Sequence, residues 1–165
     1  MNATEGFERF VREHQDMVYT TALRLLGQES EAEDAAQDAF LKAFERFEAV
    51  SAMENPGGWL RTVTTNLCLN HLGRHRRRWS LFSELEEGFE EGLPAAEGLS
   101  RQNDLERALL ALPDHQRVPL VLFHFESLSY EDIAGRLGVS LGKVKTDIFR
   151  GRAALRRALG EAPDE

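Results

Sequence analysis

The stretch S-Y-E-D-I-A-G-R-L-G-V-S-L-G-K-V-K-T-D-I-F-R-G-R, residues 129–152, decides the fold of the second half of this 165-residue chain. A serine precedes each of its two apolar-periodic segments, and Gly138 between them supplies a tight turn. Ile133, Val144 and Ile148 recur at the spacing that lets two helices pack on each other. The pattern predicts a helix-turn-helix, a motif whose second helix enters the major groove of DNA.

Polar, basic and aromatic side chains occupy the outward positions of the second helix of this motif. They are residue types that reach bases and phosphates in a major groove. The set comprises Lys143, Lys145, Thr146, Phe149 and Arg150. The alternative is an ordinary helical hairpin with a solvated basic face, but the turn, both caps and the one-sided charge together favour DNA binding.

Helical periodicity recurs through the rest of the chain, and no segment alternates with a period of two residues. A first helix has apolar residues from Phe7 onwards and ends at Gly27. Ser30 and Glu33 form a capping box that opens a second helix. A third helix runs from near Trp59 to a cluster of arginines.

Apolar spacing also predicts which faces of these helices are buried. In the second helix the apolar side comprises Ala32, Ala35, Ala36, Ala39, Phe40, Ala43, Phe44 and Phe47. In the third helix it comprises Trp59, Leu60, Val63 and Leu67. A short helix before Pro113 follows in the second half, and helical periodicity then continues through Pro119, where a kink is expected.

The charges are unevenly distributed. The formal net charge of −8 argues against a simple nucleic-acid binder. However, residues 61–78 contain five basic residues and no acidic one. Residues 136–157 contain seven basic residues and one acidic residue. Residues 80–104 hold seven acids against one base, together with glycine and proline, which is typical of a polar linker.

These patterns predict an all-α protein with two small helical domains. The first domain covers residues 1–79, a flexible acidic linker covers residues 80–104, and the second domain, residues 105–165, contains the helix-turn-helix. A composition of 42% hydrophobic and 29% charged residues is that of a folded chain, neither fibrous nor wholly disordered.

Several functional classes are excluded by what the sequence lacks. Cys68 is the single cysteine, which rules out an internal disulfide and a cysteine metal cage. Glu5 and Glu8 stand where a signal peptide is basic, and no apolar stretch approaches about 20 residues, so we expect a cytoplasmic protein without membrane insertion. His71 and His75 stand four residues apart, but two ligands do not make a zinc site. We expect no metal, no cofactor and no catalysis by the chain itself.

Three segments together resemble one bacterial family. L-S-Y-E-D-I-A-G-R-L-G-V-S-L-G-K-V-K-T-D-I-F-R-G-R-A-A-L-R resembles the promoter-reading C-terminal domain of extracytoplasmic-function (ECF) sigma factors of the sigma-70 family. D-A-A-Q-D-A-F-L-K-A-F-E-R-F, residues 34–47, resembles their core-polymerase-binding helix. N-P-G-G-W-L-R-T-V-T-T-N-L-C-L-N-H-L-G-R-H-R-R-R, residues 55–78, resembles their promoter-opening segment. The match covers nearly the whole chain in the family's order.

The resemblance implies core RNA polymerase and promoter DNA as partners, the DNA both as duplex and as single-stranded non-template strand. An anti-sigma factor is a further candidate partner. Polymerase binding is assigned by motif position to Asp34, Gln37, Asp38, Leu41 and Lys42. These residues leave a mixed charged and apolar face opposite the alanines, which suits a partner, although a solvated helix face is the alternative.

The resemblance also implies capture of a flipped non-template base of the −10 element by the loop at residues 50–58 and a following asparagine. The residues assigned to this site and its basic track are Asn66, Asn70, Arg61, Arg74, Arg77 and Arg78. Val50 and Met53 stand in the loop where the family frequently has an aromatic residue. We interpret Trp59 as a core anchor rather than a stacking platform.

For the −35 element, the resemblance assigns base contacts to Lys145, Thr146 and Phe149. Phosphate contacts are assigned to Ser140, Lys143, Arg150 and Arg152. Asp147 stands where the family often has a basic residue. It accepts a hydrogen bond from a cytosine amino group or, as we favour, pairs with Lys143 or Arg150.

The expected function is that of an ECF sigma factor, which binds core polymerase and directs promoter recognition and transcription initiation. A free-standing helix-turn-helix regulator that acts without polymerase is the alternative, and it leaves residues 34–78 unexplained.

Overall fold

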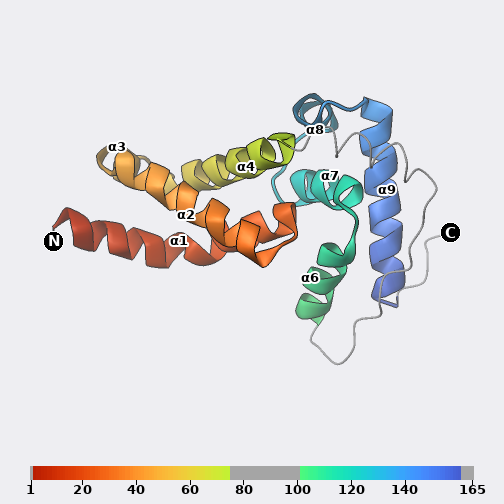
Figure 1. Ribbon diagram of the computed structural model, residues 1–165, viewed down its shortest axis with the longest axis horizontal. Coiled ribbons are helices and arrows are strands. Elements are labelled where there is room, and N and C mark those ends of the chain that lie inside the picture. The colour runs from red at the N-terminus through yellow and green to blue at the C-terminus, as the bar shows by residue number, and fades with distance from the viewer. Residues whose placement is uncertain (1, 75–100, 161–165) are drawn as a thin grey trace. The chain divides into compact units, whose positions relative to one another are not determined.

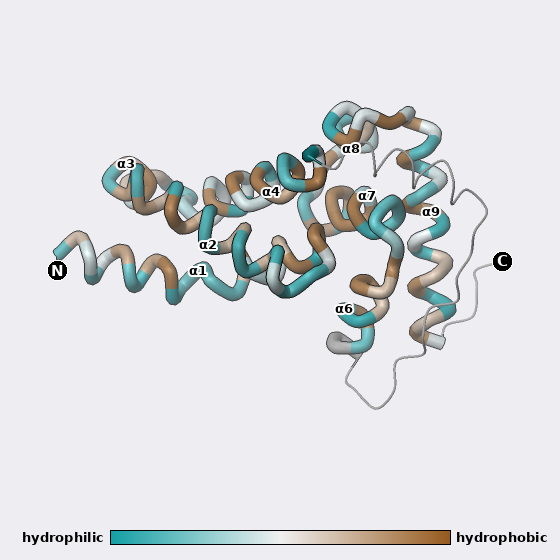
Figure 2. The backbone as a smooth tube through the Cα atoms, in the orientation of Figure 1, coloured by the Kyte–Doolittle hydropathy of each residue, from teal (hydrophilic) through white to brown (hydrophobic). Residues whose placement is uncertain are grey.

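The computed structural model describes residues 2–74 and 101–160, and the chain divides into two compact units, residues 1–71 and 72–165. Each regular element within the described ranges is an α-helix (Figure 1). The predicted all-α fold class is therefore confirmed. Figure 2 shows hydrophobic and hydrophilic residues alternating along the helices, as expected when each helix buries one face.

The first unit contains α1 (Ala3–Leu26), α2 (Glu29–Glu45), α3 (Phe47–Ser51) and α4 (Pro56–Arg74). At the start of α1, the side-chain oxygen of Asn2 accepts a hydrogen bond from the Glu5 amide at 2.8 Å. At its end, Gly27 lies in the left-handed region at φ 76°, and its N–H donates to the Leu23 carbonyl at 2.8 Å. The predicted end of the first helix is confirmed, because glycine adopts this conformation without a Cβ clash.

The start of α2 differs from the predicted capping box. The helix begins at Glu29, and its N-cap is Gln28, which makes no side-chain capping bond. The Gln28 carbonyl accepts from the Ala32 amide at 2.9 Å, so Ser30 already lies inside the first turn. The capping box of Ser30 and Glu33 was therefore wrong. Instead, Glu29 and Glu31 place negative charge in the first turn, where the helix dipole favours it.

Small and large side chains from all four helices form the core of the first unit. Its buried members are Phe10, Val18, Ala39, Ala43, Val50 and Leu60. Ala32, Ala35, Ala39 and Ala43 are buried as predicted, and side chains of this size let α1 and α2 approach closely. Partly buried residues, among them Phe40, Phe47 and Trp59, pack around this cluster.

Two details of these buried faces were predicted incorrectly. Phe44 was assigned to the apolar side of α2, but 59% of it is exposed, because the neighbouring Ala43 takes the inward position. On α4 the buried face also includes Thr64, Thr65 and Cys68, which the apolar pattern omitted. The Thr64 hydroxyl donates to the Leu60 carbonyl at 2.8 Å, so this polar side chain is satisfied inside the core.

The second unit contains α6 (Arg101–Ala111), α7 (Asp114–His124), α8 (Tyr130–Leu137) and α9 (Leu141–Ala158). Arg117 is 3% exposed and donates to the Leu112 carbonyl at 3.0 Å, which ties the start of α7 to the end of α6. Pro119 is buried inside α7, and the helix continues through it. Gly151 lets α9 approach α7, because an added Cβ would lie 3.0 Å from a methyl group of Leu120.

The expected linker lies mostly outside the described residues. Residues 80–100 of the predicted linker lie outside the described residues, whereas α6 begins at Arg101. The last four residues of the predicted linker, 101–104, therefore lie in a helix and not in a connecting segment.

Candidate nucleic-acid and partner-binding surfaces

The helix-turn-helix is formed by α8, a glycine turn and α9. The Ser129 hydroxyl oxygen accepts from the Asp132 amide, and the Ser140 hydroxyl oxygen accepts from the Lys143 amide, both at 3.1 Å. Gly138 lies at φ 69°, and its N–H donates to the Ala134 carbonyl at 2.9 Å. Both predicted caps and the predicted turn are confirmed.

The buried side of this motif contains the residues that the sequence predicted. Ile133 of α8 and Val144 and Ile148 of α9 are at most 1% exposed. Their burial fixes α9 against the rest of the unit and determines which of its side chains face outward. Lys145, Thr146 and Ser140 are exposed, as is 70% of Phe149.

Lys143, Arg150 and Arg152 of the predicted DNA-contacting set are only partly exposed. Asp147 is 4% exposed, and its carboxylate pairs with the Lys143 ammonium at 3.2 Å. The favoured pairing of Asp147 within the chain is therefore confirmed. A buried carboxylate in such a pair is poorly placed to accept from a cytosine.

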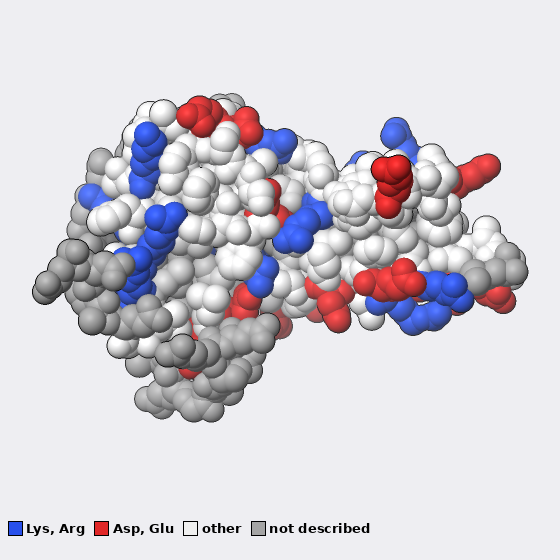
Figure 3. Space-filling model, turned by 180° about the vertical axis from the view of Figure 1, so that it is seen from behind, with Lys and Arg blue, Asp and Glu red and all other residues white. Residues whose placement is uncertain are grey.

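The charged residues of α9 are almost all basic. Its bases are Lys143, Lys145, Arg150, Arg152, Arg156 and Arg157, and its single acid is the buried Asp147. Figure 3 shows several Lys and Arg side chains on the second unit, where acidic side chains gather at another part of the surface. Such a local concentration of cations can neutralise phosphates despite the negative net charge of the chain.

Two histidines of α7 have lowered pKa values. Burial of His115, which is 3% exposed, lowers its pKa to about 4, and the nearby Lys143 and Arg150 act in the same direction while Asp114 opposes them. Burial and then Arg152 lower the pKa of His124. The neutral His124 ring can therefore accept a hydrogen bond, and the Arg152 Nε donates to its Nε2 at 2.9 Å.

The predicted −10 residues lie along α4. Asn66 is partly buried, while Asn70 and Arg74 are exposed. These three residues follow one another at four-residue spacing and share a side of the helix. Arg61 is partly buried and lies at a different angle around α4. Arg77 and Arg78 lie outside the described residues.

The predicted base-capturing loop is shorter than expected. Residues 47–51 form α3 and α4 begins at Pro56, so the connection comprises residues 52–55. Val50 is fully buried in the core and cannot contribute to a surface pocket, whereas Met53 is 38% exposed. The Asn55 side-chain oxygen accepts from the Gly58 amide at 2.9 Å, which closes the turn.

Gly58 leaves room for the Asn55 side chain in this turn, since an added Cβ would lie 2.5 Å from the Asn55 side-chain nitrogen. Trp59 follows directly and packs against the core of the first unit. Its interpretation as a core anchor is therefore confirmed.

The predicted polymerase-binding residues form one exposed face of α2. All five are exposed: Asp34, Gln37, Asp38, Leu41 and Lys42. Leu41 is 56% exposed, an unusual value for a leucine on a helix with a well-defined buried side. The face thus combines charge with an exposed apolar side chain, as protein-binding surfaces do.

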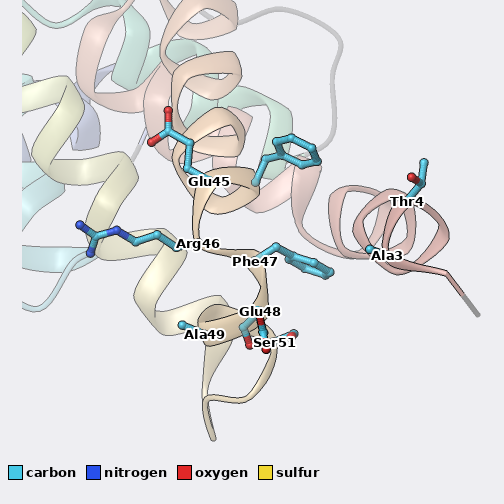
Figure 4. Close-up of a pocket in the computed structure, with 9 residues that line it drawn as sticks. Ala3, Thr4, Glu45, Arg46, Phe47, Glu48, Ala49 and Ser51 are labelled. Carbon is cyan, nitrogen blue, oxygen red and sulfur yellow. Dashed lines mark hydrogen bonds between the residues drawn. The ribbon is translucent and has the colours of Figure 1, made fainter.

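A shallow groove next to this face was missed by the sequence reasoning. Its lining residues are Ala3, Thr4, Phe44, Glu45, Arg46, Phe47, Glu48, Ala49 and Ser51. In Figure 4, Phe47 points from the α2–α3 junction toward the first turn of α1, whereas Arg46 points away from it. The exposed Phe44 was the signal, but it was interpreted as a core residue because it follows the alanine pattern.

His71 pairs with Glu31 at 3.1 Å and thereby links α4 to α2. His75 lies outside the described residues. Within residues 2–74 and 101–160, no cluster of three or more histidine, cysteine or acidic side chains is placed to hold a metal ion. No helix in these two ranges is long and apolar enough to span a membrane.

Comparison with known proteins gives two family matches. The model of Sigma-70 region 2 matches residues 10–78, and the model of Sigma-70 region 4 matches residues 102–155. The chain is an ECF sigma factor of the sigma-70 family. The resemblance of the three sequence segments to this family is thus confirmed. Region 2 contains most of α1 and all of α2 to α4, and region 4 contains the helix-turn-helix.

Curated relatives match nearly the whole length of the chain. The chain is 37% identical over 99% of its length to the ECF RNA polymerase sigma factor SigE of Mycolicibacterium smegmatis, and it spans 65% of that protein. It is 32% identical over 94% of its length to the ECF RNA polymerase sigma factor SigW of Bacillus subtilis, and it spans 89% of that protein.

A solved structure is similar as well. The sigma factor RpoE of Bartonella quintana, in complex with the anti-sigma factor NepR, is 26% identical, with a TM-score of 0.52. The match covers 94% of this sigma factor and 98% of the RpoE chain.

Proposed function

We propose that this sigma factor binds core RNA polymerase through the exposed face of α2 and directs it to promoters. The observation that carries the proposal is the presence of both region 2 and a well-formed region 4 helix-turn-helix in one chain. A free-standing helix-turn-helix regulator has no use for region 2, which the relatives share. In this proposal the sigma factor acts in the cytoplasm, where polymerase and promoter DNA are found.

The two regions have different tasks in this proposal. Region 4 recognises the −35 element as duplex, with Lys145, Thr146 and Phe149 at the base edges. Region 2 captures the non-template strand of the −10 element, with Asn66 and Asn70 at the flipped base. Extruding a base costs a few kcal/mol of stacking, which a preformed site and a basic track can offset.

The phosphate contacts in region 4 come from Ser140, Lys143, Arg150 and Arg152. Because Lys143 is paired with Asp147, its contribution to phosphate neutralisation is smaller than that of Arg150 or Arg152. The sigma factor itself supplies no catalytic group in this proposal, and polymerase performs the chemistry.

An anti-sigma factor is the further partner that we propose. Its support is the Bartonella relative, whose structure contains one. Co-expression of this sigma factor with a candidate anti-sigma factor should yield a complex that no longer associates with core polymerase. A complex that still binds core polymerase would contradict this part of the proposal.

The polymerase-binding face is tested by Asp38→Arg, which reverses a charge at an exposed position. We expect this variant to lose association with core polymerase in a pull-down, while its helical circular dichroism stays unchanged. Glu13→Arg, an equal charge reversal at an exposed position of α1, is the matched control and should bind normally. Unchanged binding of Asp38→Arg would remove the docking assignment.

A further inference from the structure

Two aromatic side chains join the end of α7 to the start of α8. The rings of Phe123 and Tyr130 are stacked, with centroids 4.5 Å apart and planes 13° from parallel. Both residues are partly buried, and neither belongs to the set of DNA-contacting residues assigned above.

A cationic side chain of α9 lies close to each ring of this pair. The Lys145 ammonium lies 5.8 Å from the centroid of Tyr130, and the Arg152 guanidinium lies 5.9 Å from the centroid of Phe123. Both distances fall within the range of about 6 Å in which a cation is attracted by an aromatic face. Lys145 and Arg152 are two helical turns apart and therefore lie on the same side of α9.

Arg152 is held by a second contact. Its Nε donates to His124 Nε2 at 2.9 Å, and His124 directly follows Phe123 in the chain. A guanidinium has five N–H donors in a rigid fork, and this bond uses the one on Nε. The two terminal nitrogens carry the other donors, which suit a phosphate.

We propose that Tyr130 and Phe123 are positioning residues. Their rings hold Lys145 and Arg152 in the orientation that binding to duplex promoter DNA requires. The inference rests on the proposed role of α9 at the −35 element and deepens it. Long cationic side chains lose rotamer freedom when they bind, and a side chain ordered in advance loses less. Tyr130 thereby supports the base contact of Lys145, and Phe123 supports the phosphate contact of Arg152.

The proposed role of Tyr130 is tested with a double-mutant cycle in the reconstituted holoenzyme. Binding to a −35 duplex is measured at fixed salt for Tyr130→Leu, Lys145→Ala and the double variant. We expect Tyr130→Leu to weaken binding by roughly two- to fivefold, a loss typical of one cation–π contact. In the Lys145→Ala background, Tyr130→Leu should have no further effect. Tyr130→Phe keeps the ring and should bind like the parent.

The outcomes separate this inference from the proposed function. If Lys145→Ala binds as well as the parent, the assignment of Lys145 to DNA fails, and the inference fails with it. If Lys145→Ala is impaired while the effect of Tyr130→Leu persists in full in its background, the proposed function stands. Tyr130 is then a structural residue only, and the positioning role is refuted.

An NMR measurement on the free sigma factor keeps the test valid if Tyr130→Leu also changes stability. The ε-methylene protons of Lys145 should show an upfield ring-current shift in the parent and in Tyr130→Phe. That shift should disappear in Tyr130→Leu. Shifts at random-coil values in the parent would overturn the inference without reference to DNA.

The Phe123 arm has a different readout, because phosphate contacts set the salt dependence of binding. Arg152→Ala should lower the slope of log affinity against log salt by about one. Phe123→Leu should lower affinity about twofold in the parent and leave it unchanged in the Arg152→Ala background. An equal loss in both backgrounds would contradict a role through Arg152.

Discussion

The helix-turn-helix of region 4 and the helices α2 and α3 of region 2 differ in what fixes the start of each helix. In region 4, α8 and α9 each begin with a serine whose side chain accepts from a backbone amide, at Ser129 and Ser140. In region 2, α2 and α3 begin without a side-chain cap. Their positions depend on burial of the alanines of α2 and of Val50 in α3.

This difference explains why the helix-turn-helix followed its local signals, whereas the start of α2 did not. A capping serine and a left-handed glycine act over three or four residues, so a short stretch of sequence specifies them. Packing of α3 against distant helices depends on side chains far apart in the chain. Variants of the two regions should therefore respond differently.

The largest effect is expected in the core of region 2. Leu60→Ala removes a fully buried side chain and should cost about 2 to 5 kcal/mol of unfolding free energy. Leu41→Ala removes the same atoms from a position that is 56% exposed and should cost much less. Urea unfolding measures both variants. Similar losses would show that packing does not decide the stability of this region.

A pH effect is expected in region 4 because His115 is buried with a pKa of about 4. The unfolded chain takes up this proton near pH 6.5, so acidification from pH 6.5 to 4 favours unfolding. The free-energy loss should reach about 3 kcal/mol for His115 alone. Stability against urea, followed through amide signals of α7, should depend less on pH in His115→Gln. Equal pH dependence in both proteins would contradict this assignment.

The two regions should also fail differently at a promoter. Lys145→Ala should weaken closed-complex binding by about 1 to 3 kcal/mol at one base step of the −35 element. Asn66→Ala should bind the closed promoter normally but open it poorly. Binding assays on substituted promoters and permanganate footprinting distinguish the two defects. Normal strand opening by Asn66→Ala would remove Asn66 from the base-capturing site.

The smallest effect compares two serines at helix starts. Ser140→Ala removes a real cap and should destabilise the chain by about 0.5 to 2 kcal/mol. Ser30→Ala changes a residue already inside α2 and should be neutral or slightly stabilising, since alanine has the higher helix propensity. Thermal unfolding of the two variants provides the comparison. A larger loss for Ser30→Ala would restore the capping box that the structure lacks.

The exposure of most candidate site residues could be predicted from the sequence. The spacing of Ile133, Val144 and Ile148 predicted the buried side of the helix-turn-helix, and the remaining positions of α9 followed as its outward face. The same reasoning found the exposed face of α2, because its alanines mark the opposite side. It failed at Phe44, which extends the alanine pattern but lies at the edge of the buried face, where it contacts Phe7 of α1 and is still 59% exposed.

The sequence by itself determined the all-α class, the helix-turn-helix with its caps, and the family. These features depend on local hydrogen bonds and on helical periodicity, which are written into neighbouring residues. Only the tertiary structure decided that Val50 is a core residue, that Asp147 is buried, and that the rings of Tyr130 and Phe123 lie next to two cations of α9. Each depends on residues brought together by packing between or along helices, and such contacts are set by the geometry of the folded chain.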